Sequence, residues 1–276
     1  MDWQIFISTA PTIFKNMQHS ALSFSHLSTG YSVRHDKIEI GKDLSASLPV
    51  GQFTCLLGPN GAGKSTLFRT LAGFIPSLSG IVTLMGRPVQ QYKAEELAKT
   101  ISVVLTERPS VTAMTVVQLV SLGRSPYTGF WGRLTDVDRH RAEEAMVLAR
   151  CVELKDRLVD TLSDGECQRV MIAKALAQDT PVIFLDEPTA FLDFPSKVEM
   201  MRTLKRLAHE AGKSILLSTH DVNMALQTAD NLWLLDRKFG LSCGSLESLA
   251  REETLQKYFL RDGIAFDDAS SSFIIV

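Results

Sequence analysis

Short apolar runs bounded by turn-forming residues recur along the chain and alternate with stretches of helical spacing. A short continuous apolar run of this kind is typical of a strand that is buried on both faces. The runs predicted to be strands are residues 53–57, 81–86, 101–105, 182–185 and 214–218. Strands that alternate with helices predict an α/β fold.

The clearest helix boundaries follow the run at 182–185. Pro195 suits the first turn of a helix, Leu204 and Ala208 continue it at helical spacing, and Gly212 suits its end. The sequence therefore predicts one long helix that leads into the strand at 214–218.

Residues 116–160 form a block of mostly helical pattern inside this α/β chain. Ala142, Ala145 and Met146 share one helical face, and the aromatic and glycine-rich segment 123–132 interrupts the pattern. Such a block predicts an inserted helical subdomain, which we place at about residues 108–164.

The two ends of the chain carry weaker patterns. Residues 21–57 are strand-like and interrupted by turn formers at 28–30, 35–36 and 48–51. Residues 1–20 have no clear periodicity, and they are either an extension or lie upstream of a translation start at Met17. We expect the main domain to span 21–236 and a short C-terminal extension to span 237–276.

Composition narrows the class of protein. Apolar residues make up 45% and charged residues 22% of the chain, which is typical of a globular domain, and the formal net charge of −2 gives no support to a nucleic-acid partner. The cysteines are scattered, so we expect free thiols. No apolar run approaches the length of about 18 residues that a membrane-spanning helix needs.

Residues 58–66 fit the pattern of a phosphate-binding loop, with a predicted strand before it and a predicted helix after it. Glycines allow such a loop to turn its N–H groups inward, and the helix directs its positive end at the same point. The alternative is a glycine-rich turn with a chance lysine. The nucleoside triphosphate site is predicted to consist of Gly58, Pro59, Asn60, Gly61, Ala62, Gly63, Lys64, Ser65 and Thr66. Lys64 would reach the terminal phosphates and Ser65 would bind Mg²⁺.

Two adjacent acids end the apolar run at 182–185. Asp186 would orient Mg²⁺, and Glu187 would polarise a water molecule in line with the γ-phosphate. A solvated turn is the alternative, which the phosphate-binding loop upstream disfavours.

Residues 162–169 precede a helical pattern of buried type. Ser163 is predicted to cap this helix, so that the positive helix end faces outward. Taken alone, this segment could equally be an ordinary capping box.

The order of these motifs along the chain resembles that in ATPase subunits of ABC transporters. The resemblance covers about residues 21–236, and its most specific part is the segment 162–169. The family implies a P-loop ATPase core with a mixed or parallel sheet, an N-terminal antiparallel β part and a helical subdomain. It also implies ATP and Mg²⁺ as ligands and ATP hydrolysis as the reaction.

The same resemblance implies a dimer of two such chains arranged head to tail. Ser163 and Gly165 would then bind the γ-phosphate of ATP held by the second copy. Glu166 would belong to the same nucleotide-binding segment, and Asp193 would help to join the two sites. Further roles follow for three other residues. Glu187 would be the general base, His220 would position the attacking water, and Tyr31 would stack on adenine.

This sequence departs from the family pattern at two stations. Glu107 stands where glutamine is usual, and a carboxylate there could still bind Mg²⁺. Residues 163–166 read Ser-Asp-Gly-Glu where Ser-Gly-Gly-Gln is usual. Asp164 lacks the backbone freedom of glycine and would repel a phosphate that it faced. We expect it to point away and turnover to be slowed.

The segment 122–138 is similar to that of importers for iron–siderophores, haem and cobalamin. This similarity implies two separate membrane permease subunits, an external substrate-binding protein and a place at the cytoplasmic face of the inner membrane. We rank ferric siderophores first, and haem and cobalamin second. An exporter ATPase, a regulatory ATPase without a transporter and a P-loop kinase remain the alternatives of other classes.

Overall fold

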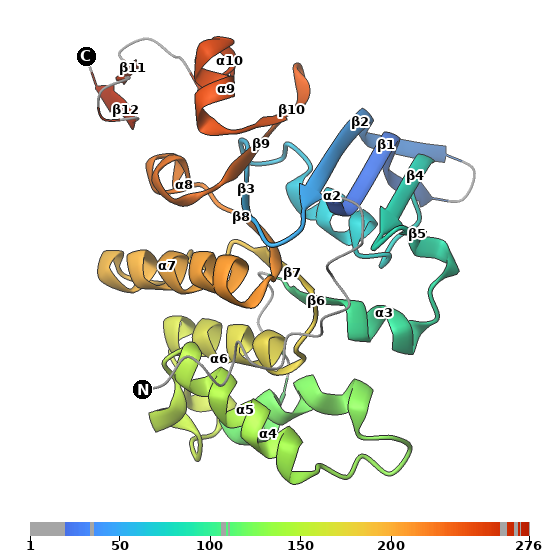
Figure 1. Ribbon diagram of the computed structural model, residues 1–276, viewed down its shortest axis with the longest axis vertical. Coiled ribbons are helices and arrows are strands. Elements are labelled where there is room, and N and C mark those ends of the chain that lie inside the picture. Colours follow the sequence, from blue (N-terminus) through green and yellow to red (C-terminus); the bar gives the residue numbers. More distant parts are fainter. Residues whose placement is uncertain are drawn as a thin grey trace. The chain divides into compact units, whose positions relative to one another are not determined.

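The computed structural model describes residues 20–33, 36–105, 109, 111–259, 264–267, 270 and 272–275. Glu107 and almost all of the predicted N-terminal extension, with Met17, lie outside these residues. The chain divides into two compact units, of which the first takes in Met1–Gln91 and Leu204–Val276 and the second Tyr92–Thr203. Figure 1 labels their elements.

An antiparallel sheet in the first unit has the strand order β2-β1-β4-β5. Its strands are β1 (Ser20–Val33), β2 (Asp36–Pro49), β4 (Ser79–Leu84) and β5 (Arg87–Pro88). The turn predicted at 28–30 is wrong, because these residues lie within β1. The register of β1 against β2 shifts between Phe24 and Gly30, so bulges bend the strand where the sequence suggests that it ends.

The second group of strands in the first unit holds the predicted phosphate-binding loop. Strand β3 (Phe53–Leu57) pairs in parallel with β8 (Ser214–Ser218) on one side and β9 (Asn231–Asp236) on the other, and β10 (Gly240–Gly244) runs antiparallel to β9. Every residue of β3 and β8 is buried. Their continuous apolar runs follow from this burial on both faces. Helix α2 (Lys64–Leu71) follows β3, and α8 (Val222–Thr228) follows β8.

The second unit contains the predicted helical block and a parallel pair of strands. Strands β6 (Ile101–Val104) and β7 (Val182–Asp186) pair in parallel. The helices are α3 (Ala94–Thr100), α4 (Val116–Ser121), α5 (Asp136–Leu148) and α6 (Asp164–Ala177), with short 3₁₀ turns such as η3 (Leu122–Tyr127) between them. Figure 1 shows α4, α5 and α6 gathered together. Ala142, Ala145 and Met146 are buried as their spacing predicts.

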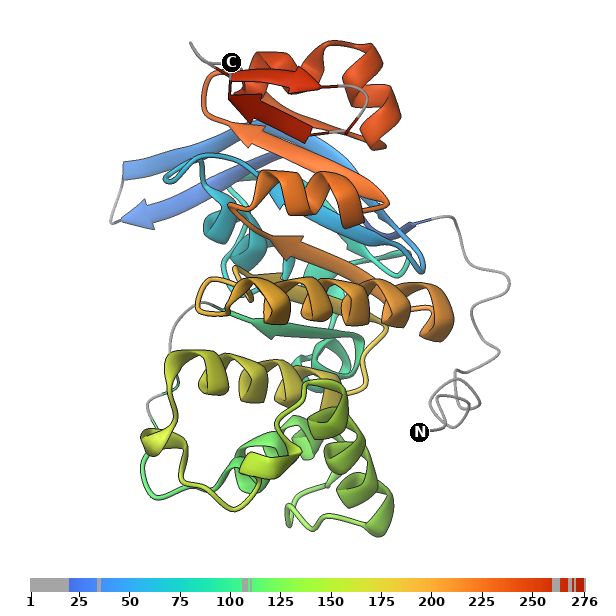
Figure 2. The ribbon, with the colours of Figure 1, turned by 90° about the vertical axis from the view of Figure 1, so that its left-hand side faces the viewer.

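Helix α7 (Phe194–Ala211) is the long helix predicted between Pro195 and Gly212 (Figure 2). Leu204 and Ala208 are buried along it, and Gly212 leaves the helix with a φ of 65°. A positive φ is costly for residues with a side chain, so glycine suits this helix end. With the two types of sheet and the helical insert, the predicted α/β fold is confirmed.

The C-terminal segment has secondary structure that the sequence pattern did not reveal. It consists of α9 (Leu246–Arg251), α10 (Thr254–Phe259) and a hairpin of β11 (Ile264–Asp267) and β12 (Ser272–Ile275). All four cysteines are free, as predicted. Across the described residues, none of the helices is long and apolar enough to span a membrane.

Candidate nucleotide-binding sites

The loop after β3 depends on glycine at three positions. Gly61 and Gly63 have φ values of 77° and 103°, which L-residues with a side chain rarely adopt. At Gly58 a Cβ atom would lie 2.2 Å from the carbonyl oxygen of Leu235. The backbone of this loop is therefore specific to glycine both in conformation and in space.

The Lys64 side chain curls back into this loop. Its Nζ atom donates to the carbonyl oxygens of Gly58 at 2.8 Å and Pro59 at 3.3 Å, and only 6% of the residue is exposed. Lys64 is also the first residue of α2. The N-cap of this helix is Gly63, which has no side chain that could accept from the first N–H groups. A buried cation and a helix N-terminus meet here, which is the arrangement that binds an anion.

Two further predicted residues of the first unit lie close to this loop. The Tyr31 hydroxyl is 3.3 Å from Oγ1 of Thr66, and 37% of Tyr31 is exposed. His220 follows β8, which pairs in parallel with β3, and the Thr219 N–H donates to the Leu56 carbonyl at 3.2 Å. Because the carboxyl ends of parallel strands share one edge, His220 is exposed at the same edge of the sheet as the loop.

One neighbour of the loop was missed at the sequence level. Arg237, in the turn after β9, donates from Nε to the carbonyl oxygen of Gly61 at 2.8 Å. Sequence spacing gives no signal for this contact, since the two residues are brought together only by the pairing of β9 with β3.

In the second unit, the predicted acid Asp186 is the last residue of β7, and the predicted acid Glu187 follows it in a different environment. Asp186 is buried with 3% exposure, whereas Glu187 is half-buried and has a φ of 51°. A left-handed conformation costs a residue with a side chain about 1–3 kcal/mol, and such residues cluster at functional sites. Among the described residues, seven others with a side chain also have a positive φ, Arg150 and Asp179 of the same unit among them, so this conformation alone does not mark Glu187 as functional.

Ser163 caps α6, as predicted, and forms a complete capping box with Glu166. The Ser163 N–H and hydroxyl each donate to Oε2 of Glu166 at 2.8 Å, and the Glu166 N–H donates to the Ser163 hydroxyl at 3.3 Å. Arg157 donates to the other carboxylate oxygen at 2.7 Å. The hydrogen bonds from Ser163, with Arg157 nearby, lower the pKa of Glu166 below its usual value.

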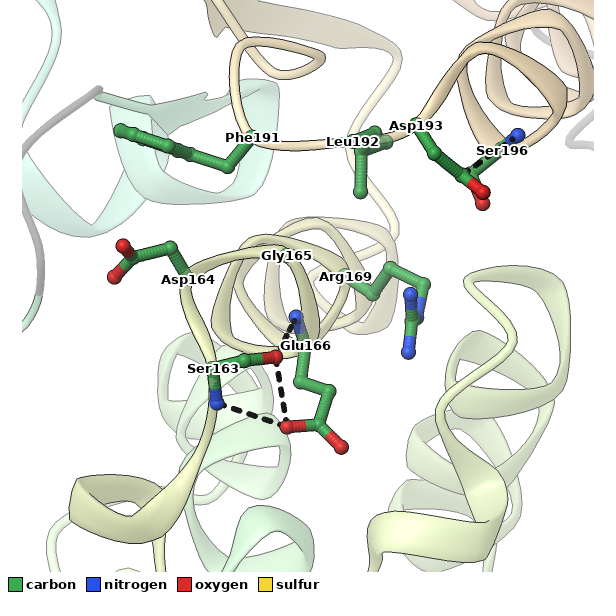
Figure 3. Close-up of a pocket in the computed structure, with 9 residues that line it drawn as sticks. All are labelled: Ser163, Asp164, Gly165, Glu166, Arg169, Phe191, Leu192, Asp193 and Ser196. Atoms are coloured by element: carbon green, nitrogen blue, oxygen red, sulfur yellow. Dashed lines mark hydrogen bonds between the residues drawn. The ribbon is translucent and has the colours of Figure 1, made fainter.

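An open pocket of about 580 Å³ lies between this helix start and the segment that leads into α7 (Figure 3). It is lined by Ser163, Asp164, Gly165, Glu166, Arg169, Phe191, Leu192, Asp193 and Ser196. A Cβ atom at Gly165 would lie 3.0 Å from the Phe191 carbonyl oxygen, so the two walls approach closely there. Asp193 accepts a hydrogen bond from the Ser196 N–H at 3.2 Å, and the hydrogen bonds to Ser196 lower its pKa.

Figure 3 also shows where the Asp164 side chain points. Its carboxylate lies on the side of the helix start opposite to Glu166 and Arg169, and Asp164 is one of the residues that line the pocket. The pocket thus brings together the predicted residues Ser163, Gly165, Glu166 and Asp193.

The donors predicted for Mg²⁺ are the Ser65 hydroxyl, which is exposed at the start of α2, and the buried Asp186 carboxylate. Both present oxygen, which is the ligand atom that Mg²⁺ prefers. The third predicted donor, Glu107, lies outside the described residues. Within the described ranges, no group of three or more His, Cys, Asp and Glu side chains is placed to hold a metal.

Comparison with known proteins adds a family match. The family model described as "ABC transporter" matches residues 41–190. The iron(3+)-hydroxamate import ATP-binding protein of Bacillus subtilis is 35% identical over 243 residues, which are 88% of this chain and 89% of that protein. The ferric enterobactin transport ATP-binding protein of Escherichia coli is 33% identical over 251 residues, 91% of each chain.

Solved structures show the same fold. A dimeric ATP-binding cassette in a post-hydrolysis state with ADP and Pi superposes with a TM-score of 0.73 at 26% identity and covers 81% of this chain and 98% of that one. A structure provisionally described as a metal-chelate type ABC transporter in an inward-facing conformation gives a TM-score of 0.75 at 25% identity. That match covers 94% of this chain and 98% of the other.

Proposed function

The chain belongs to the ABC transporter family and hydrolyses ATP, and on this premise we propose that it powers the import of ferric siderophores through separate membrane subunits. The observation that carries the proposal is the match to two siderophore-transport ATPases over about nine-tenths of each chain. That match includes the helical insert, whose segment 122–138 is similar to that of importers for iron–siderophores, haem and cobalamin. Haem and cobalamin are the alternative cargoes.

We propose that the first unit binds the triphosphate. The Lys64 ammonium would leave the carbonyls of Gly58 and Pro59 and bind the terminal phosphates, because a phosphate oxygen is a stronger acceptor for a cation than a neutral carbonyl. The rest of the loop would donate its N–H groups, and the Tyr31 ring would stack on adenine. The position of the Tyr31 hydroxyl beside Thr66 supports this role.

ATP hydrolysis would be catalysed by residues that follow β7 and β8. Glu187 would accept a proton from the attacking water, and His220 would orient that water toward the γ-phosphate. The Ser65 hydroxyl and the Asp186 carboxylate would hold Mg²⁺, which neutralises charge on the phosphates when it is bound. The position of Glu187 directly after the buried strand β7, which ends at Asp186, supports this role.

We further propose that two copies of the chain bind ATP between them. The pocket at the start of α6 would take the γ-phosphate from the second copy through Ser163 and Gly165, with Glu166 and Asp193 at its edge. The dimeric cassette among the similar structures supports this assembly. Two permease subunits would hold the pair at the cytoplasmic face of the inner membrane, and an external binding protein would deliver the cargo. We assign the ATPase domain to residues 21–236, with its helical subdomain at about 108–164.

The test is uptake by cells that lack the gene for this chain. The cells receive the parent gene, the Glu187→Gln variant or an empty vector, and they are offered labelled ferric siderophore, haem and cobalamin in turn. We expect only the parent gene to restore uptake, and only of the siderophore. Restored uptake of haem or cobalamin instead would overturn the cargo assignment, and no restoration of any of the three would overturn the assignment as an importer.

A further inference from the structure

The turn between β9 and β10 places a cation at the apex of the phosphate-binding loop. Arg237 is exposed, yet its Nε atom donates to the Gly61 carbonyl at 2.8 Å. A terminal nitrogen of the same guanidinium lies 3.9 Å from the point where a Cβ atom of Gly61 would stand. Arg237 therefore packs along the loop apex as well as donating to it.

The turn that carries Arg237 is held from two sides. The Asp236 carboxylate accepts the N–H groups of Lys238 at 2.7 Å and Phe239 at 3.3 Å. From α10, the Tyr258 hydroxyl lies 3.3 Å from the Phe239 carbonyl and 3.2 Å from the Gly240 carbonyl. A turn fixed at both ends presents its side chain with little loss of conformational entropy on binding.

Aromatic contacts add to this support. The Phe239 and Tyr258 rings have centroids 5.6 Å apart, and the Lys257 ammonium lies 4.9 Å from the Phe239 ring centroid. The C-terminal segment, whose helices α9 and α10 lie beside β10 in Figure 1, thus braces the turn next to the phosphate-binding loop through Tyr258 and Lys257.

The contact with Gly61 has a consequence for the N–H groups of the loop. In a trans peptide the C=O of one residue and the N–H of the next point in opposite directions. Because Arg237 holds the Gly61 carbonyl outward, the Ala62 N–H points into the loop, where it donates to the Pro59 carbonyl at 3.2 Å. The Gly61–Ala62 peptide is thus held at both ends, with its carbonyl on Arg237 and its N–H on the Pro59 carbonyl. These two contacts fix the shape of the loop, and the guanidinium adds a permanent positive charge at its apex.

We propose that Arg237 is a positioning residue for ATP binding, which orients the Gly61–Ala62 peptide and is itself oriented by the C-terminal segment. This inference rests on ATP binding at residues 58–66. It does not depend on which cargo is imported or on the acids that catalyse hydrolysis.

The test measures the affinity of the full chain for a fluorescent, non-hydrolysable ATP analogue with Mg²⁺, beside kcat and KM for ATP. We expect Arg237→Ala to weaken binding about tenfold, because the loop loses a hydrogen bond from a charged donor as well as a positive charge, and solvent screens part of this effect at an exposed site. KM should rise by a similar factor with kcat little changed. Arg237→Lys, which keeps the charge and a donor, should recover part of the affinity.

Lys238→Ala is the matched control, because it removes the same charge from the next position, where the ammonium lies 5.1 Å from the Phe239 ring centroid. We expect it to change affinity by less than about twofold, as is usual for an exposed charge. Equal weakening by both variants would assign the effect to general electrostatics and overturn the proposal. So would unchanged affinity in Arg237→Ala. If the parent chain itself fails to bind the analogue, ATP binding at the loop is refuted, an outcome distinct from a failure at Arg237 alone.

Discussion

Two helix starts, that of α2 in the first unit and that of α6 in the second, are both proposed to bind phosphate, but they are built in opposite ways. Helix α2 begins after Gly63, with no side-chain cap and no acid in its first turn. Helix α6 begins after Ser163 with a complete capping box and has Asp164 and Glu166 in its first turn. One start leaves its N–H groups to a ligand, and the other satisfies part of them itself.

The acids at α6 have a clear physical effect on the helix. Negative side chains near a helix N-terminus are favourable by about 0.3–1 kcal/mol each, because they complement the helix dipole. The same charges oppose an anion that approaches this end. The Ser163 hydroxyl also donates a hydrogen bond to the Glu166 carboxylate, so a phosphate would compete with this carboxylate for the hydroxyl. The start of α6 is therefore more stable without ligand and less ready for phosphate than that of α2.

The largest effect is expected outside both helix starts, at the residue proposed as general base. Replacing Glu187 by Gln should lower ATP turnover by about 10²–10⁴-fold, which is the usual contribution of a general base, and should leave ATP binding intact. Phosphate release and equilibrium binding of ATP measure the two quantities. Normal turnover in Glu187→Gln would remove Glu187 from the role of base.

The next largest effect concerns the glycines at the two helix starts. Gly63→Ala should lower the free energy of unfolding by about 1–3 kcal/mol, because alanine must adopt a φ of 103° and its Cβ atom would lie 2.7 Å from Cγ2 of Ile40. Gly165 has an ordinary helical backbone. Gly165→Ala should cost less than about 1 kcal/mol, since the gain in helix propensity offsets the tight approach to Phe191.

Urea denaturation of the two variants beside the parent measures this difference. Both variants should lose ATP turnover, but only Gly63→Ala should also lose much of its stability. Equal destabilisation would show that the start of α6 is as constrained as the phosphate-binding loop and would remove the contrast between them.

Features set by the local sequence pattern could be predicted, and features set by contacts between distant segments could not. The strands that hold the phosphate-binding loop, Asp186 and His220 follow from continuous apolar runs, since burial on both faces requires them. The cap at Ser163 follows from local hydrogen-bonding chemistry. The bulges within β1 and the contact between Arg237 and Gly61 could not be predicted, because both depend on pairing between segments distant in sequence. The Glu166–Arg157 ion pair depends likewise on how the chain turns before α6.

A smaller effect is expected from the acid that departs from the family pattern. Asp164 is exposed and lines the proposed phosphate pocket, with its carboxylate on the side opposite to Glu166 (Figure 3). Because exposed charges act weakly across solvent, Asp164→Gly should raise ATP turnover by less than about tenfold. A steady-state ATPase assay at low and high salt measures this, since screening should reduce the difference. A much larger rise would mean that Asp164 restrains hydrolysis by facing the phosphate.

The smallest effect is a pH dependence confined to the start of α6. The pKa of Glu166 in the folded chain is below its ordinary value of 4.5, owing to the hydrogen bonds from Ser163 and the Arg157 guanidinium. A depressed pKa contributes stability that is complete above pH 4.5 and is lost as pH falls through the folded value. Glu166→Gln should therefore reduce the stability difference between pH 6 and the acid side of this pKa, while the start of α2, with no acid in its first turn, has no corresponding loss.

Unfolding midpoints of the parent and Glu166→Gln chains across this pH range measure the effect. Glu247→Gln is the control, because Glu247 forms an exposed pair with Arg251 on α9. If both variants change the pH dependence of the unfolding midpoint equally, the capping box contributes no more than an exposed surface pair does. The expected pH-dependent stability at the start of α6 would then be wrong.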